Sequence, residues 1–406
     1  MRVSFVIMTH NRRGVLAETL GRLPGLMAGD GLAPGDWEAV VADNGSTDGT
    51  GARLAEIAGR PDARVVPLIL GENLGCQARN AGVARARGEV VVFLDDDSWP
   101  RPGAVAGVLA RMAAEPGLGV LGGAVYLPDG RQDYGALPRV PPGCALAVRR
   151  TAFQRAGGFD AGFGMAAEEF ELVCRVLAAG FAAERDATLG FEHLKTPVAR
   201  RPARIAKLDL RNNLIVLDRW VSEPLRSELK SDWTQRYAAL LHDAGADADP
   251  AAVGREAAAY PRSAACEPPA AGAAPLGDGA IEALFGFAAI QRSLAAWSDA
   301  RGVRRVMLLG YTKTLLPVWR AGEALKLEVV GVADDGPAFA GLNYRGVPVL
   351  TTAAAGRHAF DAWLLTNRNP AQKARQAASV AGDGRPVWGL EEGGNRRGSQ
   401  ERAGDR

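Results

Sequence analysis

Three consecutive aspartates, Asp95, Asp96 and Asp97, follow the apolar run at residues 90–94. Side chains alternate along an extended chain, so Asp95 and Asp97 point the same way if the extended conformation continues through them. Two convergent carboxylates are suitable ligands for a hard divalent cation such as Mg²⁺ or Mn²⁺. Such a cation could bridge a diphosphate and offset the charge on a departing nucleotide. The alternative for this tripeptide alone is a polar loop with capping aspartates.

Two other apolar runs also end in polar residues. Thr9, His10 and Asn11 follow residues 3–8, and Asp43 follows residues 40–42. In parallel α/β sheets, ligands bind at the carboxyl ends of the strands, so these positions and the aspartates outline one crevice. An aspartate at such a strand end can accept hydrogen bonds from a base or a ribose. Taken alone, Asp43 has the alternative role of a turn residue.

A second acidic group, at Glu168, Glu169 and Glu171, lies at the start of a predicted helix. A hydroxyl group is a poor nucleophile until its proton is being removed, and a carboxylate facing a crevice can remove it. A neighbouring acid such as Glu168 tends to raise the pKa of Glu169 toward the working pH. The alternative is that the three acids favour the positive end of the helix dipole.

The elements that must position these residues alternate between strand and helix. Continuous apolar runs between helices indicate a buried parallel sheet, so the fold class is α/β of the nucleotide-binding type. Ser46 and Thr47 are expected to cap the second helix. Over residues 1–110, the expected strands are 3–8, 37–42, 64–70 and 89–94, and the expected helices are 14–26, 48–58 and 76–86.

The remainder of the chain divides by composition. Residues 244–279 are dominated by Ala, Pro, Gly and Asp and are predicted to form a linker or a loosely packed connection. A second strand–helix pattern begins near residue 305. The expected strands are 119–126, 143–148, 305–309, 327–333, 347–350 and 362–365, and the expected helical stretches are 166–179, 202–241, 280–301 and 314–325.

Bulk properties exclude several classes of protein. The net charge is +2, from 48 basic and 46 acidic residues, so nothing points to a nucleic acid partner. The four cysteines are scattered without zinc-site spacing, which favours reduced thiols in the cytoplasm. The N-terminus reads as a strand rather than a signal peptide, and no apolar run is long enough to span a bilayer. We expect a cytoplasmic protein that is at most peripheral to the inner face of the membrane.

Several motifs in series resemble the family 2 glycosyltransferases of the GT-A fold. They are VIMTHNR at 6–12, VADNGSTDGT at 41–50, NLG at 73–75, ARN at 78–80, ARGE at 86–89 and LDDD at 94–97. The resemblance covers roughly residues 3–220, and the ordered series is more specific than any one motif. It implies a GT-A glycosyltransferase domain.

The resemblance also implies residue roles. Thr9, Asn11 and Asp43 would contact the nucleoside, with Asp43 reading the base. Arg79 would lie near the donor diphosphate. The alternative for Arg79 is a charged side chain on the exposed surface of a helix. Asp95 and Asp97 would bind ribose and metal as the D-x-D pair. Asn73 and Asp96 belong to the same motifs and are also expected to bind the donor.

The acceptor half resembles the family more loosely. Residues 143–150 (GCALAVRR) resemble the small-residue acceptor strand, and 157–160 (GGFD) follow as in many relatives. Residues 167–172 (AEEFEL) resemble the E-D-x-D-L element, with Glu169 where Asp is usual; in inverting members that acid is the base. Because Glu is one methylene longer, the position of the base differs. Many relatives have a late histidine that completes the metal site, here His193, whose alternative role is structural. Arg211 and Asn212 resemble an Arg-Asn element that packs near the active site in relatives.

The C-terminal part is similar to Rossmann-like domains of polysaccharide-biosynthesis proteins. Its first turn, GYTKT at 310–314, lacks the G-x-G-x-x-G pattern for close approach to a pyrophosphate. Asp334 follows the second strand, at the position in the sequence where a ribose-binding acid is expected. A packing or regulatory module is the alternative to a cofactor site.

We therefore expect a GT-A domain at 1–220, a helical extension with linker at 221–302, a Rossmann-like domain at 303–397 and a disordered tail at 398–406. The predicted activity is inverting transfer of a sugar from a UDP- or dTDP-sugar, with Mn²⁺ or Mg²⁺, to a glycan, lipid-linked or small-molecule acceptor. The alternatives are a sugar-nucleotide nucleotidyltransferase, a catalytically inactive binding protein, and a bifunctional or regulatory protein whose C-terminal domain binds a nucleotide or nicotinamide cofactor.

Overall fold

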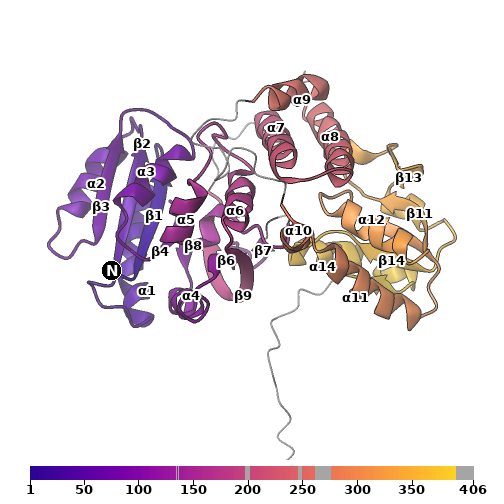
Figure 1. The fold of residues 1–406 in the computed structure, drawn as a ribbon, viewed down its shortest axis with the longest axis horizontal. Helices are drawn as coiled ribbons and strands as arrows, with labels where there is room; N and C mark the ends of the chain where they lie inside the picture. The colour runs from indigo at the N-terminus through magenta and orange to yellow at the C-terminus, as the bar shows by residue number, and fades with distance from the viewer. Residues whose placement is uncertain (134, 136, 197–201, 246–248, 261–275, 390–406) are drawn as a thin grey trace, which may run out of the picture.

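Two β-sheets joined by a group of helices make up the protein (Figure 1). The computed structural model describes residues 1–133, 135, 137–196, 202–245, 249–260 and 276–389. The first sheet has nine strands, and the second has six. The predicted α/β fold class is confirmed.

The first half of the nine-stranded sheet is parallel, in the order β3-β2-β1-β4. Its strands are β1 (Val3–Thr9), β2 (Trp37–Asn44), β3 (Val65–Leu70) and β4 (Val90–Asp95), and its helices are α1 (Arg13–Gly29), α2 (Thr50–Ala58) and α3 (Gln77–Arg85). Strands β1, β2 and β4 are buried along almost their whole length, as their continuous apolar runs predict. Thr9 pairs with Asp43 and Met8 with Asp95, so the polar strand ends share one edge.

The second half of this sheet is mixed, in the order β4-β8-β6-β9-β5. Its elements are β5 (Ser98–Pro100), α4 (Ala104–Ala114), β6 (Leu118–Tyr126), β7 (Gln132–Asp133), η1 (Gly143–Ala145), β8 (Leu146–Arg149), α5 (Arg150–Ala156), α6 (Glu168–Ala178) and β9 (Ala182–His193). Strand β8 runs antiparallel to β4 and β6. Strand β5 pairs with the end of β9, which places His193 opposite Ser98.

In the described residues between the two sheets the chain forms the helices α7 (Pro202–Trp220), α8 (Leu225–Asp243), α9 (Pro250–Ala258), α10 (Asp278–Phe285) and α11 (Phe287–Asp299). Part of the predicted linker is a packed helix, because α9 buries Val253 and Ala257 and contacts α7. Its start is capped by Asp249, a signal that composition alone does not reveal. The single helix expected at 280–301 is two helices, which meet at Gly286 with φ +70°.

The six-stranded sheet has the order β12-β13-β11-β10-β14-β15. Its elements are β10 (Arg305–Leu309), α12 (Leu315–Ala324), β11 (Glu328–Ala333), η2 (Pro337–Phe339), β12 (Asn343–Tyr344), β13 (Val347–Leu350), α13 (Thr352–Ala355), β14 (Ala362–Leu365), α14 (Pro370–Val380), η3 (Ala381–Asp383) and β15 (Val387–Trp388). All its pairings are parallel except that of β12 with β13. The chain builds outward from β10 through β11 and β13, then returns to add β14 on the other side.

Two local predictions are wrong. Ser46 and Thr47 do not cap α2; its N-cap is Gly49, and Asp48 accepts the N–H of Thr50 instead. The strand expected at 143–148 begins with the 3₁₀ turn η1. The predicted tail at 398–406 lies outside the described residues, and the domain limits stay predictions.

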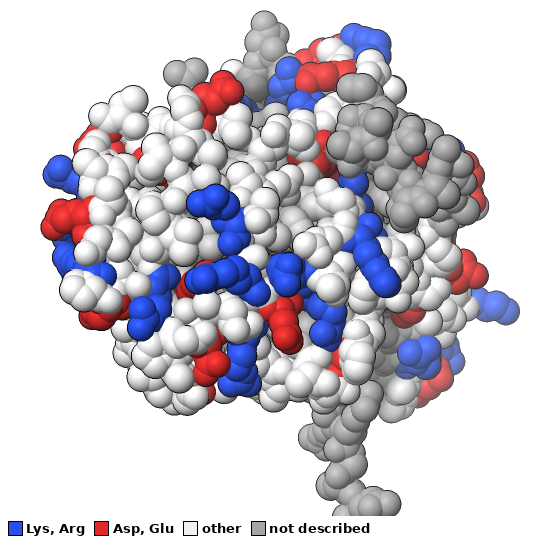
Figure 2. Space-filling view, turned by 60° about the vertical axis from the view of Figure 1, so that its left-hand side comes forward, with Lys and Arg blue, Asp and Glu red and all other residues white. Residues whose placement is uncertain are grey.

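Helices α7 and α8 contribute to the core of the first sheet, where Trp220 and Trp233 are each 1% exposed. Among the described residues, no helix combines the length and the apolar character that crossing a lipid bilayer requires. On the face shown in Figure 2, basic and acidic side chains both lie among uncharged residues.

Candidate active site

Two of the three aspartates converge on one histidine. Strand β4 ends at Asp95 and the chain turns, so the convergence arises from a turn and not from continued extension. His193 Nε2 lies 3.3 Å from Asp97 Oδ1 and 3.6 Å from Asp95 Oδ2. The Leu194 N–H donates to the Asp97 carbonyl at 3.0 Å, which ties the turn to the end of β9.

Asp96 points to a different set of partners. It accepts a hydrogen bond from Thr9 Oγ1 at 2.7 Å and pairs with Arg12 Nε at 2.8 Å. Arg12 also pairs with Asp97 through Nη2 at 2.8 Å. Burial raises the pKa of Asp96 to about 6, although Thr9 and Arg12 oppose the rise. The sequence motifs do not single out Arg12; its place directly after Asn11 at a strand end is the available signal.

Three side chains that could each offer one metal ligand meet beside His193. Ligand atoms of Asp95, Cys144 and His193 lie within 4.8 Å of one another. Burial raises the pKa of the Cys144 thiol, so this residue stays a neutral thiol, 3.4 Å from His193 Nδ1. Burial also opposes ionisation of Asp97, but hydrogen bonds from His193 and the Thr196 N–H outweigh it and hold the Asp97 pKa below its usual range. Asp97 is not in this group, although its Oδ1 lies 3.3 Å from His193 Nε2, and carboxylate oxygens and imidazole nitrogens are ligand types that Mn²⁺ accepts.

The remaining predicted donor residues hold the loops along the same sheet edge. Asp43 is 2% exposed and accepts the Ser46 N–H at 3.0 Å. Asn11 Oδ1 accepts the Thr47 N–H at 2.7 Å. Asn73 Oδ1 accepts a hydrogen bond from Asn44 Nδ2 at 3.1 Å. These contacts connect the loops that follow β1, β2 and β3 into one rim.

Arg79 connects Asp95 with the acidic residues at the start of α6. It is only 4% exposed, which excludes the alternative of a surface charge. Its Nη2 pairs with Asp95 Oδ1 at 2.9 Å, and its Nη1 lies 3.7 Å from Glu168 Oε1. One guanidinium therefore bridges the acid that ends β4 and the acid that begins α6.

A strained turn leads into α6. Ala166 and Ala167 adopt φ values of +69° and +57°, which non-glycine residues seldom adopt. Asn212 of α7 is fully buried, and its Nδ2 donates to the carbonyls of Phe163, Met165 and Ala166 at 3.0, 2.9 and 2.8 Å. The Arg-Asn element thus supports the turn that positions Glu168 and Glu169.

Glu168 and Glu169 form a coupled acidic pair. Burial raises the pKa of Glu168 to about 8, with a further rise from the charge of Glu169 and partial compensation by Arg79. Burial also raises the pKa of Glu169, and Arg79 opposes it. A Cβ on Gly143 would stand 2.3 Å from Glu169 Oε1 and 2.9 Å from Arg79 Nη1. Glycine at residue 143 is what allows these two side chains to reach the start of β8.

Residues 4–167 match the sequence profile of the family described as "Glycosyl transferase family 2". This segment belongs to that family. The family 2 segment contains the three aspartates, Arg79 and Gly143 and ends directly before Glu168, whereas His193 and Asn212 lie beyond it.

Relatives of the family 2 segment include validoxylamine A glucosyltransferase from Streptomyces hygroscopicus subsp. limoneus, 35% identical over 32% of this chain and 28% of that protein. Another is undecaprenyl-phosphate 4-deoxy-4-formamido-L-arabinose transferase from Pseudomonas fluorescens (strain Pf0-1), 35% identical over 37% of this chain and 42% of that protein. The chain thus spans less than half the length of these relatives. Among solved structures, the chain is similar to the mannosyltransferase PcManGT from Pyrobaculum calidifontis, determined in complex with GDP-Man and Mn2+. The two chains are 18% identical and superpose with a TM-score of 0.46, and the match covers 80% of this chain and 86% of that one.

Proposed function

We propose that this protein is an inverting, divalent-metal-dependent glycosyltransferase that moves a sugar from a nucleotide-diphosphate donor, UDP- or dTDP-linked, to an acceptor hydroxyl. The observation that carries the proposal is the continuous charged array within one buried site. Arg79 contacts Asp95 on one side and approaches Glu168 on the other. A donor site and an acid pair are thereby brought within reach of one substrate complex.

The donor half is formed by the ends of β1, β2 and β4. Asp95, Asp97 and His193 would hold Mn²⁺ or Mg²⁺, and a cation there supplies charge neutralisation for the leaving diphosphate. Arg79 would add a second positive charge beside the diphosphate, and Asp96 positions Thr9 and Arg12. Thr9, Asn11, Asp43 and Asn73 form the nucleoside wall.

The acceptor half centres on Glu169, which takes the proton of the attacking hydroxyl. The acceptor oxygen forms a bond to the anomeric carbon while the bond from that carbon to the diphosphate oxygen breaks, with the electron pair leaving on the nucleotide. Attack from the face opposite the leaving group inverts the anomeric configuration. Glu168, held protonated by its raised pKa, does not place a second negative charge beside Glu169 at neutral pH.

The acceptor belongs to small-molecule or lipid-linked glycan chemistry. Support for this acceptor comes from the relatives, whose names include validoxylamine A and undecaprenyl phosphate. A lipid-linked acceptor requires the protein to work at the membrane surface. We therefore place it in polysaccharide, glycolipid or glycoconjugate biosynthesis, with peripheral contact to the membrane.

A donor panel assayed by nucleotide-diphosphate release tests the proposal. We expect release only with Mn²⁺ or Mg²⁺, and abolition by EDTA. Asp97→Asn should lower kcat by about 100-fold or more, because it removes charge that is fixed at the reacting diphosphate. Asp129→Asn is the matched control, since Asp129 is exposed and pairs only locally with Arg131. Unchanged turnover in Asp97→Asn, or pyrophosphate as the product, would contradict the proposal.

A further inference from the structure

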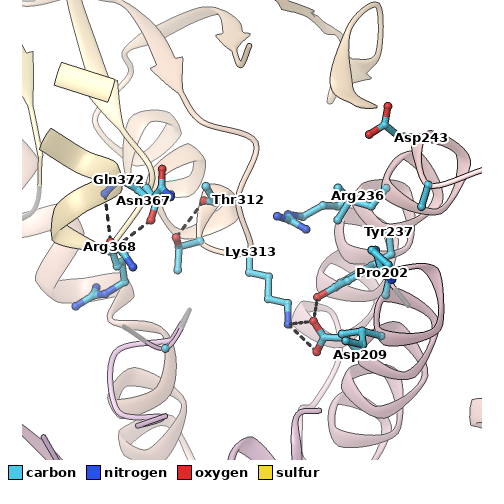
Figure 3. Close-up of a pocket in the computed structure, with 17 residues that line it drawn as sticks. Pro202, Asp209, Arg236, Tyr237, Asp243, Thr312, Lys313, Asn367, Arg368 and Gln372 are labelled. Atoms are coloured by element: carbon cyan, nitrogen blue, oxygen red, sulfur yellow. Dashed lines mark hydrogen bonds and ion pairs between the residues drawn. The ribbon is translucent and has the colours of Figure 1, made fainter. Parts of the chain in front are cut away.

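A cavity of about 820 Å³ lies between the helices α7 and α8 and the six-stranded sheet (Figure 3). One wall comes from the loop after β10 and the loop after β14, and it is polar. The opposite wall, from α7 and α8, includes the apolar side chains Ile205, Ala206 and Leu240. None of the residues assigned above to the candidate active site lines this cavity.

The position of the cavity follows from the topology of the second sheet. The chain builds β10, β11 and β13 in one direction and then places β14 on the other side of β10. Loops after β10 and β14 therefore diverge, and such switch points are where open α/β sheets bind ligands. Five of the residues that line the cavity, Thr312, Lys313, Thr314, Asn367 and Arg368, come from these two loops.

The acid that ends β11 does not reach this cavity. Asp334 accepts the Tyr311 N–H at 2.6 Å and the Gly336 N–H at 2.8 Å. Both of its oxygens thus hold the turn that follows β10 together with the turn that follows β11. A ligand is consequently expected over β10 and β14 and not over β10 and β11, where a ribose-binding acid would place it.

Three cationic and two acidic side chains line the cavity. Lys313 is paired with Asp209, both of whose oxygens lie 3.2 Å from Nζ. Arg236 uses Nε to bind the Tyr311 carbonyl at 3.1 Å. Within the part of the chain that the structure describes, the two Nη groups of Arg236 have no hydrogen-bond partner. With Arg368 and Asp243 included, the lining carries a net charge of +1, which favours an anionic group.

The two walls suit the two parts of one ligand. Apolar side chains of α7 and α8 can cover a planar ring. The hydroxyls and amides of the loop wall can bind phosphate oxygens together with Lys313 and Arg368 of that wall and Arg236 of α8. A volume of about 820 Å³ is in the range of pockets that enclose nucleotide-sized molecules. We propose that this cavity binds a nucleoside diphosphate or a dinucleotide, independently of the donor crevice.

Calorimetric titration of the full chain in EDTA tests the proposal. The probes are UDP, ADP and NAD⁺, with uridine, adenosine and inorganic pyrophosphate as their parts. We expect at least one nucleotide to bind more tightly than either part, and Arg236→Gln to weaken it about tenfold or more through loss of charged hydrogen bonds. Ala206→Trp, which fills the cavity without touching its charges, should abolish binding.

Two further variants distinguish binding in this cavity from binding at the surface or in the donor crevice. Arg292→Ala removes an exposed arginine of α11 that does not line the cavity, and binding should be unchanged. Asp97→Asn alters the donor crevice, and binding should again be unchanged. The proposal is overturned if no nucleotide binds, or if pyrophosphate binds as tightly as the nucleotides. It is also overturned if Asp97→Asn removes the binding. Finally, it is overturned if Ala206→Trp and Arg236→Gln unfold at the same temperature as the parent and bind the nucleotide with the same affinity.

Discussion

Glu168 and Glu169 are neighbours in the chain but differ in their surroundings. Glu168 is 8% exposed, and within the described structure its Oε2 has no hydrogen-bond partner. Glu169 is partly exposed and lies against Gly143. The less buried member of the pair is the one able to meet an acceptor, and the more buried member is the one that keeps its proton.

The two acids should therefore respond differently to amide substitution. Glu169→Gln should lower kcat by about 100- to 10,000-fold, because the variant cannot accept the hydroxyl proton. Glu168→Gln should retain most activity, because glutamine resembles a protonated glutamate in shape. Steady-state kinetics at pH 7 with an identified donor measures both. Equal losses in the two variants would contradict the assignment of Glu169 as the base.

The raised pKa of Glu168 also predicts a pH dependence of stability. The folded protein keeps the Glu168 proton up to about pH 8, whereas the unfolded chain releases it near 4.5. The unfolded state therefore binds fewer protons between these values, and this carboxyl lowers the free energy of unfolding as pH rises. Urea unfolding at pH 5 and pH 8 should show a smaller decrease in Glu168→Gln than in the parent. Glu18→Gln, at an exposed site, is the control and should match the parent.

At the scale of elements, α7 supports the turn before α6. The carbonyls that accept from Asn212 belong to the segment with two left-handed alanines. Asn212→Ala should cost about 1–3 kcal/mol of stability through unpaired buried carbonyls. It should also lower kcat more than it raises KM, because the acid pair loses its fixed position.

The adjacent residue supplies a matched control for this variant. Asn213 is 2% exposed, and its Nδ2 donates to Asp209 rather than to the turn. Asn213→Ala should therefore lose stability with little change in kcat. Similar kcat values in the two variants, measured at equal fractions folded, would contradict a positioning role for Asn212.

At the scale of the whole molecule, α8 connects the two sheets. Trp233 Nε1 donates to the Lys313 carbonyl at 3.2 Å, and Gln235 Nε2 donates to the Asn343 carbonyl at 2.8 Å. Tyr344 OH donates to Asp232 Oδ2 at 2.6 Å. The same helix buries Trp233 in the core that extends to the first sheet. A helix shared in this way couples the unfolding of both sheets.

Calorimetry should accordingly show one main unfolding transition. Trp233→Ala removes a buried indole, for which the expected cost is about 3–5 kcal/mol, and should lower the whole transition or split it. Trp297→Ala, at a partly buried position of α11, should have a smaller effect. Two separate transitions in the unaltered protein would show that the sheets unfold independently.

The sequence by itself determined the parallel half of the first sheet and the polar edge that it presents. Strands β1, β2 and β4 are apolar on both faces and end in polar residues, and such local patterns can be read without knowing any distant contact. Four parallel strands of the second sheet, β10, β11, β13 and β14, were also predicted, whereas the two-residue strand β15 was not. The break at Gly286 and the helix α9 were not predicted from the sequence, because Ala-rich segments show little periodic alternation of apolar and polar residues.

Only the tertiary structure decided how the site is assembled. The meeting of His193 with Asp95 and Asp97 depends on the pairing of β5 with β9, and the support from Asn212 depends on the packing of α7. The cavity of about 820 Å³ forms where α7 and α8 face the switch point of the second sheet. Contacts between segments far apart in the chain leave no periodic pattern in either segment, so their geometry appears only once the chain has folded.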